Sequence, residues 1–171
     1  MKQFINHLLW FAGLLLLQIL LLDNMHFMGI FIPVVYVYGI LRLPSSMSVY
    51  SVLIIGFLVG LTMDIFSNTL GMHAAATTLL GLVRYPVIRL FVLKEDMSSK
   101  NVSYVWMGKS VFWQYCLILV LLHHLTLFLL ESLSFFNSWV LLLKVPVCTF
   151  LTMIFIFAME FINHKDHARK P

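Results

Sequence analysis

Two charged side chains stand inside long apolar stretches of the sequence and are the first candidates for chemistry. Asp64 ends a run that begins near Val49, and Lys144 lies within a run that begins near Trp139. An unpaired charge in an apolar medium costs at least a few kcal/mol, so each needs a partner or access to water. We expect Asp64 and Lys144 to form an ion pair inside the membrane. Two alternatives stay open, in which Lys144 snorkels to the water boundary or pairs with Glu131.

Small residues share a helical face with the aspartate. At 100° per residue, Gly56, Gly60, Asp64 and Ser67 fall within an arc of about 80°. Two glycines four residues apart let a second helix approach closely. This face, continued by Gly71, is therefore a predicted helix–helix contact, made either within the protein or with a partner.

The other polar residues predict no catalytic or metal centre. His123 and His124 are adjacent, so they point about 100° apart on a helix, whereas helical metal-binding pairs favour i, i+4 spacing. The sequence has no nucleophile elbow, zinc-protease motif, phosphate loop or dinucleotide fingerprint. We therefore expect no cofactor, no metal and no enzymatic activity. Gln18 is expected to hydrogen-bond between helices, and Cys116 and Cys148 to be free, buried thiols.

The composition places these residues in a bilayer. Of the 171 residues, 61% are hydrophobic and 11% charged, whereas soluble domains carry about a quarter charged residues. The mean hydropathy is +0.98. The net charge of +4 is not gathered into one patch, so nucleic acid is not an expected partner. A bilayer core about 30 Å thick takes about 20 helical residues. We predict one all-α integral membrane domain, residues 1–171, with six transmembrane helices at 5–22, 27–41, 49–66, 70–93, 111–130 and 138–161.

The ends of three predicted spans need comment. The first is read as an uncleaved span, because no small-x-small cleavage site follows Leu22. The second is short. The fourth contains Arg84, Pro86 and Arg89, so an alternative is that its apolar part ends near Val83 and the remainder lies along the membrane surface.

Basic residues predict the orientation. Cytoplasmic loops are rich in Lys and Arg. Of the 11 basic residues, all but Lys144 fall on one side of a six-span arrangement: Lys2, Arg42, Arg84, Arg89, Lys94, Lys100, Lys109, Lys165, Arg169 and Lys170. This alternation predicts that both ends of the chain are cytoplasmic (N-in, C-in). The loop from Lys94 to Lys109 is then expected to contact anionic lipid or a cytoskeletal partner.

The stretch from Gly56 to Gly71 resembles the signature of MreD, the rod shape-determining membrane protein family of bacteria. The shared residues are Gly56, Gly60, Asp64-Ile65, Ser67 and Leu70-Gly71. Pro33 at the start of the second apolar run and Leu43-Pro44 before the third support the resemblance. Over residues 31–71 the resemblance is one of sequence. Over the rest of the chain it is a resemblance in length, number of spans and the basic central loop.

The resemblance implies a non-enzymatic scaffold of the bacterial cytoplasmic (inner) membrane that regulates cell shape and side-wall peptidoglycan synthesis. The implied partners are an MreC-like protein, an MreB-like cytoskeleton, a RodA-like glycosyltransferase and a class B penicillin-binding transpeptidase, together with membrane lipid. The implied fold is similar to the substrate-binding S component of energy-coupling-factor transporters. The alternative function is therefore a vitamin-type, small-molecule binding subunit of an importer, which needs a polar, aromatic-lined outer cavity. The short outward loops are poor in polar groups and favour the scaffold.

Overall fold

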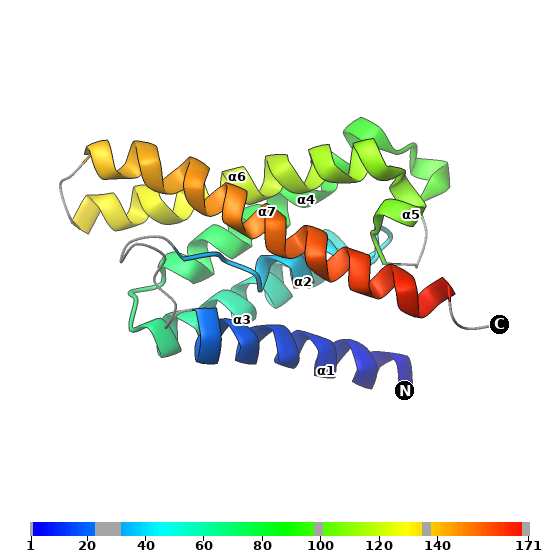
Figure 1. Cartoon of the computed structure of the whole chain (residues 1–171), viewed down its shortest axis with the longest axis horizontal. Coiled ribbons are helices and arrows are strands. Elements are labelled where there is room, and N and C mark those ends of the chain that lie inside the picture. The colour runs from blue at the N-terminus through cyan, green and yellow to red at the C-terminus, as the bar shows by residue number, and fades with distance from the viewer. Residues whose placement is uncertain (1, 23–31, 98–100, 135–137, 169–171) are drawn as a thin grey trace.

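Four long helices form the frame of the protein, which we describe from a computed structural model. They are α3 (Val49–Ser67), α4 (Met72–Phe91), α6 (Lys109–Ser134) and α7 (Ser138–Ala168). α3 packs against α4, α4 against α6, and α6 against α7 (Figure 1). The structure describes residues 2–22, 32–97, 101–134 and 138–168, with side chains for 10–20, 22, 32–97, 101–132 and 143–162.

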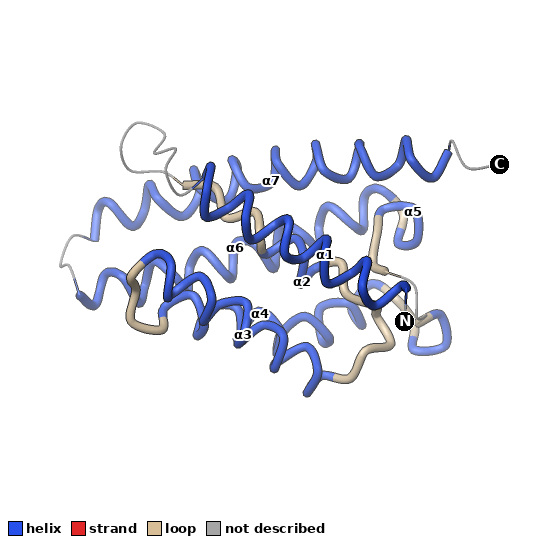
Figure 2. The backbone as a smooth tube through the Cα atoms, turned by 90° about the horizontal axis from the view of Figure 1, so that it is seen from below, coloured by secondary structure: helices blue, strands red, loops and turns tan. Residues whose placement is uncertain are grey.

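Shorter segments complete the fold. α1 (Lys2–Leu17) continues into a π-helical turn, η1 (Gln18–Leu22), and α2 (Val37–Leu41) is buried among the long helices. A 3-10 turn, η2 (Lys94–Asp96), and α5 (Tyr104–Met107) follow α4. The start of α1, α5 and the end of α7 lie at one end of the molecule, which we call the α5 end (Figures 1 and 2). The turn from α3 to α4 lies at the opposite end, the hairpin end.

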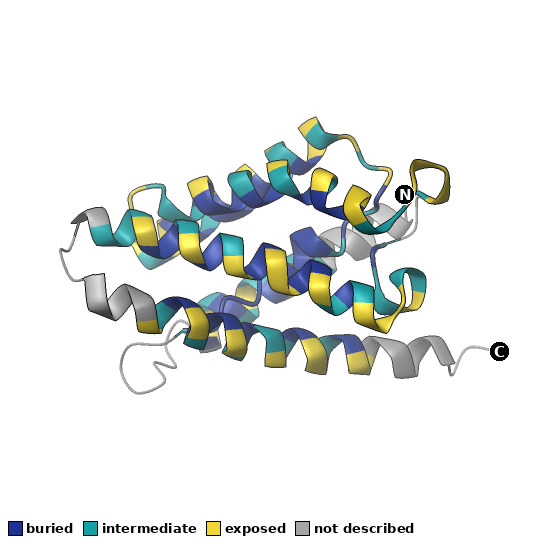
Figure 3. Ribbon diagram, turned by 90° about the horizontal axis from the view of Figure 1, so that it is seen from above, coloured by how far each residue is buried: buried dark blue, intermediate teal, exposed yellow. Residues whose placement is uncertain are grey.

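Each long helix has a buried and an exposed face (Figure 3). Large apolar side chains are exposed on these helices, whereas several charged side chains are buried. Ile65 of α3 and Phe150 of α7 are 70% and 67% exposed, whereas Asp64, Arg84 and Glu160 are buried. Soluble proteins show the opposite distribution. Four helices are long and apolar enough to cross a bilayer: α3, α4, α6 as far as Ser132, and residues Leu143–Ile162 of α7. The chain is an all-helical, multi-pass membrane protein, as predicted. The described residues contain no strand, only an isolated bridge between Pro44 and Asn101.

The second predicted span is broken. We expected a helix over 27–41. Residues 27–31 lie outside the described part, residues 32–36 are not α-helical, and α2 supplies only Val37–Leu41. The prediction of a helix is therefore wrong for the described residues before α2. Pro33 has no N–H and disfavours helical backbone at the residue before it, which opposes helix formation at this point.

Side chains from other helices satisfy the backbone of the break. Gln18 Nε2 donates to the carbonyl of Pro33 at 3.0 Å, and Gln18 Oε1 accepts from Val35 N at 2.7 Å. Thr152 Oγ1 of α7 accepts from Val34 N at 2.9 Å. Non-helical backbone occurs at membrane depth only where protein groups surround it and satisfy it. Gln18 was expected to hydrogen-bond between helices; these two bonds run instead to the non-helical backbone before α2.

The five other predicted spans coincide with helices of the structure. The predicted ranges 5–22, 49–66, 70–93, 111–130 and 138–161 correspond to α1 with η1, α3, α4, α6 and α7. α4 continues without a break through Arg84 and Pro86 to Phe91, so the alternative end near Val83 is wrong. Pro86 has no N–H to donate along the helix, yet the neighbouring Val87 and Ile88 are buried. Packing against the other helices therefore keeps this turn of α4 helical.

A prediction concerns the break before α2. Gln18→Leu removes both bonds to the segment and keeps a side chain of similar bulk. We expect the free energy of unfolding to fall by about 1–3 kcal/mol, because a carbonyl and an N–H stay buried without partners. Unfolding in mixed detergent micelles, followed by circular dichroism, measures it. Gln114→Leu is the matched control, since Gln114 is exposed and bonds to Ser110 on its own helix. Equal stability of the two variants would contradict this role of Gln18.

Candidate functional site

The glycine face of α3 is covered by α4. A Cβ built on Gly60 would lie 2.5 Å from the Cα of Ala74 and 2.5 Å from the carbonyl oxygen of His73. A Cβ on Gly56 would lie 2.8 Å from the carbonyl oxygen of Thr77. Thr77 also donates its hydroxyl to the Gly56 carbonyl at 2.7 Å. The predicted helix–helix contact is therefore made within the protein, and this face is not open to a partner.

Asp64 lies on the same face and caps the next helix. Its Oδ1 accepts from His73 N at 3.0 Å and its Oδ2 from Ala74 N at 2.8 Å, and the Thr69 hydroxyl also donates to Oδ1. The first N–H groups of a helix have no partner within it, and the helix N-terminus carries partial positive charge, so a carboxylate is stabilised there. Gly71, at the N-cap position, has no side chain to do this. Asp64 supplies the cap from α3.

Left-handed backbone sets the turn between the two helices. Ser67 is the last residue of α3, Asn68 follows with φ 53°, and Gly71 has φ 77°. Asn and Gly adopt positive φ more readily than other residues. A Cβ on Gly71 would meet no atom within 4 Å, so the requirement there is conformational. Ser67 and Gly71 thus belong to the turn, whereas Gly56, Gly60 and Asp64 make the contact.

The expected ion pair between Asp64 and Lys144 is wrong. Lys144 Nζ lies 2.7 Å from Glu131 Oε1, the alternative partner. Asp64 is engaged at the start of α4, whereas Glu131 is on α6, which packs beside α7. The Lys144 and Glu131 side chains are 18% and 39% exposed, so the protein encloses the pair only in part.

A buried tyrosine brings together two histidines that the sequence does not connect. The hydroxyl oxygen of Tyr36, directly before α2, lies 2.8 Å from His73 Nδ1 and 3.3 Å from His123 Nε2. Tyr36 and His123 are fully buried, and His73 is half-buried in the first turn of α4. The contact depends on the break before α2, which a hydropathy pattern does not reveal. Among the described residues, no group of three or more His, Cys, Asp or Glu is placed to hold a metal ion.

His124 has a different role from its neighbour. Its Nδ1 lies 2.9 Å from the carbonyl oxygen of Val120, which only accepts, so Nδ1 carries the hydrogen. Its Nε2 then accepts from the Thr152 hydroxyl at 3.5 Å. Because Thr152 accepts from Val34 N, His124 lies at one end of a chain of hydrogen bonds that holds the broken segment.

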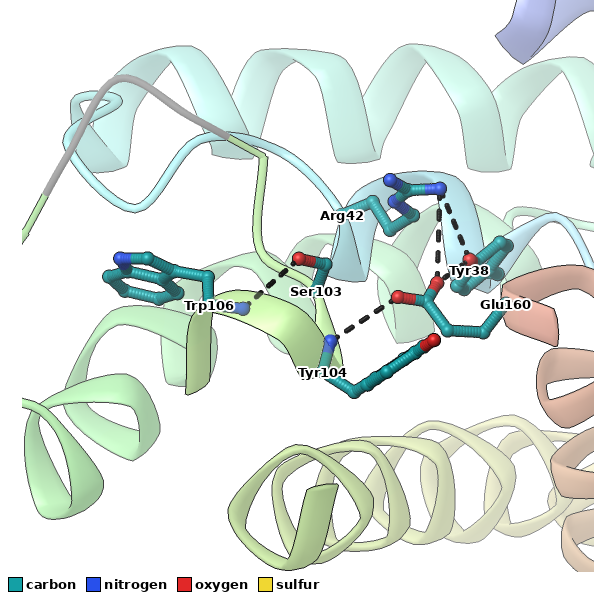
Figure 4. A network of polar contacts seen from close by, with 6 residues as sticks. All are labelled: Tyr38, Arg42, Ser103, Tyr104, Trp106 and Glu160. Carbon is teal, nitrogen blue, oxygen red and sulfur yellow. Dashed lines mark hydrogen bonds and ion pairs between the residues drawn. The ribbon is translucent and has the colours of Figure 1, made fainter. Parts of the chain in front are cut away.

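A second buried network lies at the α5 end, and sequence reasoning missed it (Figure 4). Glu160 of α7 accepts from the Tyr38 hydroxyl of α2 and from the backbone N–H of Tyr104 in α5, the latter at 3.3 Å. Arg42 Nη1 lies 3.8 Å from Glu160 and 3.3 Å from the Tyr38 hydroxyl. Its guanidinium also stacks on Trp10 of α1, 5.6 Å from the ring centroid. One carboxylate thereby connects α7 to α2 and α5 directly, and to α1 through Arg42.

Arg84 serves the short helix α2 rather than a loop. Its Nη2 donates to the carbonyl of Leu43 and lies 3.5 Å from that of Leu41. The Tyr115 hydroxyl of α6 donates to the same Leu41 carbonyl at 2.9 Å. Leu41 is the last residue of α2 and Leu43 lies just after it, so neither carbonyl has a partner within the helix. Arg84, which was counted among the basic residues of the cytoplasmic side, is 1% exposed and is not a surface charge.

Basic side chains at the α5 end divide into interior and surface groups. Arg89, Lys94 and Lys109 are exposed, whereas Arg42 is largely buried in the Glu160 network. Lys100, also predicted to contact lipid or a cytoskeletal partner, lies outside the described residues. Within the loop from Lys94 to Lys109, for which this contact was expected, Lys94 and Lys109 are the two described lysines, and both are exposed.

An apolar groove runs along the outer side of the α3–α4 pair. Phe57 and Leu61 form its α3 wall, and Ala74, Ala75 and Thr78 form its α4 wall. The Thr78 hydroxyl donates to the Ala74 carbonyl of its own helix at 2.7 Å, so its hydrogen is already bonded. The groove therefore suits hydrocarbon and not a polar small molecule.

No protein-family model, curated protein or solved structure matches this chain.

A prediction tests the glycine contact. Gly60→Ala places a methyl group against the backbone of α4, so the two helices must separate. We expect a loss of about 1–3 kcal/mol in the free energy of unfolding. Thermal unfolding in detergent measures it. Gly13→Ala is the matched control, because a Cβ on Gly13 would meet nothing within 4 Å. A Gly60→Ala protein as stable as the control would contradict the close packing of α3 and α4.

Proposed function

We propose that this protein is a non-enzymatic scaffold of the cell-wall elongation machinery in the bacterial cytoplasmic membrane, acting as MreD-type proteins do. The observation that carries the proposal is the stretch from Gly56 to Gly71. Its family-like residues have a joint structural role, in which two glycines admit α4, Asp64 caps it, and Gly71 makes the turn. A motif used for packing favours an architectural protein over one whose motif surrounds a reaction centre.

The proposed topology has six spans with both ends in the cytoplasm. α1 with η1, the broken second segment, α3, α4, α6 and α7 are the six crossings. Two observations support it. The start of α1 and the end of α7 lie at the same end of the molecule, as an even number of crossings requires (Figure 1). The exposed Arg89, Lys94 and Lys109 lie in or beside the segments that connect α4 to α6, on the proposed cytoplasmic side.

The proposed partners are an MreC-like protein, an MreB-like cytoskeleton, a RodA-like glycosyltransferase and a class B penicillin-binding transpeptidase. The glycine face is occupied by α4, so a membrane partner must use another surface. The exposed apolar side chains of α3 and α7 offer such surfaces within the bilayer. The exposed lysines at the α5 end offer a contact for the cytoskeletal partner or for anionic lipid.

One observation favours the second candidate, a vitamin-type binding subunit of an importer. Interrupted spans whose backbone is satisfied by side chains are common around substrate sites in transporters. Here the break before α2 is filled by Gln18, Thr152 and Tyr36. The apolar groove beside α3 and α4 also lacks the polar groups that such a substrate needs. Because side chains already occupy the break and the groove is apolar, the scaffold is favoured over the importer subunit.

A labelling experiment tests the proposed topology. Asn68→Cys places a thiol at the hairpin end, and Lys109→Cys places one at the α5 end. Both native cysteines, Cys116 and Cys148, are buried and serve as the unlabelled background. In intact cells we expect a membrane-impermeant maleimide that crosses the outer envelope to modify Asn68→Cys and spare Lys109→Cys. Both must react after permeabilisation. Labelling of Lys109→Cys alone in intact cells would overturn the N-in, C-in orientation.

Purification from the native host tests the function. The tagged full-length protein is isolated in mild detergent and its companions are identified by mass spectrometry. We expect an MreC-like protein and the wall-synthesis enzymes, enriched at least tenfold over an equally abundant, unrelated multi-pass protein with the same tag. Recovery of a transporter's membrane subunit with its ATPases would contradict the scaffold and support the importer.

A further inference from the structure

The apolar groove on the outer side of the α3–α4 pair is about as long as one leaflet of a bilayer is thick. It begins at Gly71, beside the hairpin turn, and its lining ends with Leu82 of α4 and Leu53 of α3. At 1.5 Å per residue, the stretch of α4 from Gly71 to Leu82 is about 16 Å long. A bilayer core about 30 Å thick has leaflets of about 15 Å each. The groove therefore extends from the membrane surface at the hairpin end to about the midplane.

The groove is concave because its two walls differ in side-chain size. Phe57 and Leu61 form the α3 wall, and both are exposed beside the small side chains of Ala74 and Ala75 on α4. Ala74 is also the residue whose Cα lies 2.5 Å from a Cβ built on Gly60, so the groove is continuous with the glycine contact. Its volume is about 770 Å³, within the range of ligand sites. An occupant would make dispersion contacts with both helices at once.

The lining of the groove carries no charge that could match a polar occupant. None of its described lining residues is ionisable, and the Thr78 hydroxyl donates its hydrogen to the Ala74 carbonyl. Both walls belong to helices that are long and apolar enough to cross a bilayer. The occupant is therefore apolar along the groove, which leaves an acyl chain of a lipid or the helix of another membrane protein.

A bulky, charged pair occupies the same face of α4 beyond the groove. At 100° per residue an arc of about 80° contains Gly71, Ala75, Thr78, Leu82, Tyr85 and Arg89. The Arg89 guanidinium lies over the Tyr85 ring, 5.9 Å from its centroid. A transmembrane helix that followed this face would have to pass over the pair, whereas an acyl chain of one leaflet ends before it. The face therefore fits an acyl chain better than a second helix.

We propose that the groove binds one acyl chain of a phospholipid from the leaflet at the hairpin end. The chain lies between Phe57 and Ala75, with its methyl end near Leu53 and Leu82. The headgroup lies at the level of the turn, where a Cβ on Gly71 would meet no atom within 4 Å. Because the chain packs on both helices of the glycine contact, it stabilises their pairing. This inference does not depend on the proposed scaffold role.

Fluorescence quenching in detergent tests the proposal. Phe57→Trp places an indole in the α3 wall, and Phe150→Trp, the matched control, places one on the exposed face of α7. The delipidated full-length protein is titrated with a phosphatidylethanolamine that carries bromine on one acyl chain. The signal of the wild type, which has four tryptophans, is subtracted. We expect quenching in Phe57→Trp to saturate at one lipid per protein. In Phe150→Trp it should rise with the brominated lipid content of the micelle and not saturate.

A second pair of variants separates the groove from general contact with lipid. Ala75→Leu, combined with Phe57→Trp, puts a larger side chain where the acyl chain lies, so we expect the saturable quenching to be lost. Ala158→Leu, at an exposed position of α7, is the matched control and must retain it. Circular dichroism checks that each variant is folded, and Leu61→Trp replaces Phe57→Trp if the latter is not.

Two outcomes would overturn the proposal. The first is quenching at the groove that never saturates, or that saturates equally in Ala75→Leu. The second is an indole in the groove that brominated lipid does not reach, in a protein that light scattering shows to be an oligomer. That result would mean that a helix of a second copy fills the groove.

Discussion

Backbone that is not helical must find its hydrogen-bond partners inside the protein when it lies at membrane depth, and this requirement governs the centre of the structure. The Pro33 carbonyl and the N–H groups of Val34 and Val35, just before α2, are bonded by side chains and not by helical backbone. Gln18 and Thr152 bond to their N–H and carbonyl groups, and Arg84 with Tyr115 bond to the carbonyls at the far end of α2. These four side chains come from η1, α7, α4 and α6. The broken segment is therefore the point at which most of the helices are tied together.

The same requirement explains why so many polar side chains are buried in so apolar a chain. Asp64 accepts from the first N–H groups of α4, and Glu160 accepts from Tyr38 and from the start of α5. In each case a carboxylate on a long helix bonds to the beginning of a shorter or later element. Hydrophobic contact alone gives little preference among helices in lipid, because lipid tails are equally apolar. The polar contacts consequently specify which helices meet and in which register.

Much of the helical layout follows from hydropathy and charge, because a bilayer demands about 20 apolar residues in each span. The close contact at Gly56 and Gly60 was also predictable, since two glycines on one helical face admit a neighbour. The identity of that neighbour was not. Asp64 was paired with Lys144 in our prediction because two opposite charges in apolar runs invite each other. The first N–H groups of a helix bind a carboxylate as a lysine does. They belong to the backbone, so no residue type marks them in the sequence.

The break before α2 was unpredictable for a related reason. Pro33 indicates that a helix is disfavoured, yet whether the chain breaks depends on partners 15 to 118 residues away. The Tyr36–His73 and Tyr36–His123 contacts depend on that break in turn. Arg84 was counted among the charges of the cytoplasmic side because a hydropathy window does not distinguish a snorkelling arginine from one that bonds to a buried carbonyl.

The cap that Asp64 provides has a consequence for synthesis of the protein. Its partners, the backbone N–H groups of His73 and Ala74, lie 9 and 10 residues further along the chain. When Asp64 first emerges from the ribosome, His73 and Ala74 are still inside it and α4 has not packed against α3, and the carboxylate alone is costly to place in hydrocarbon. The lowest-cost route is for α3 to stay next to water until the first turn of α4 has formed. The two helices then enter the bilayer together, as one inserted unit rather than two.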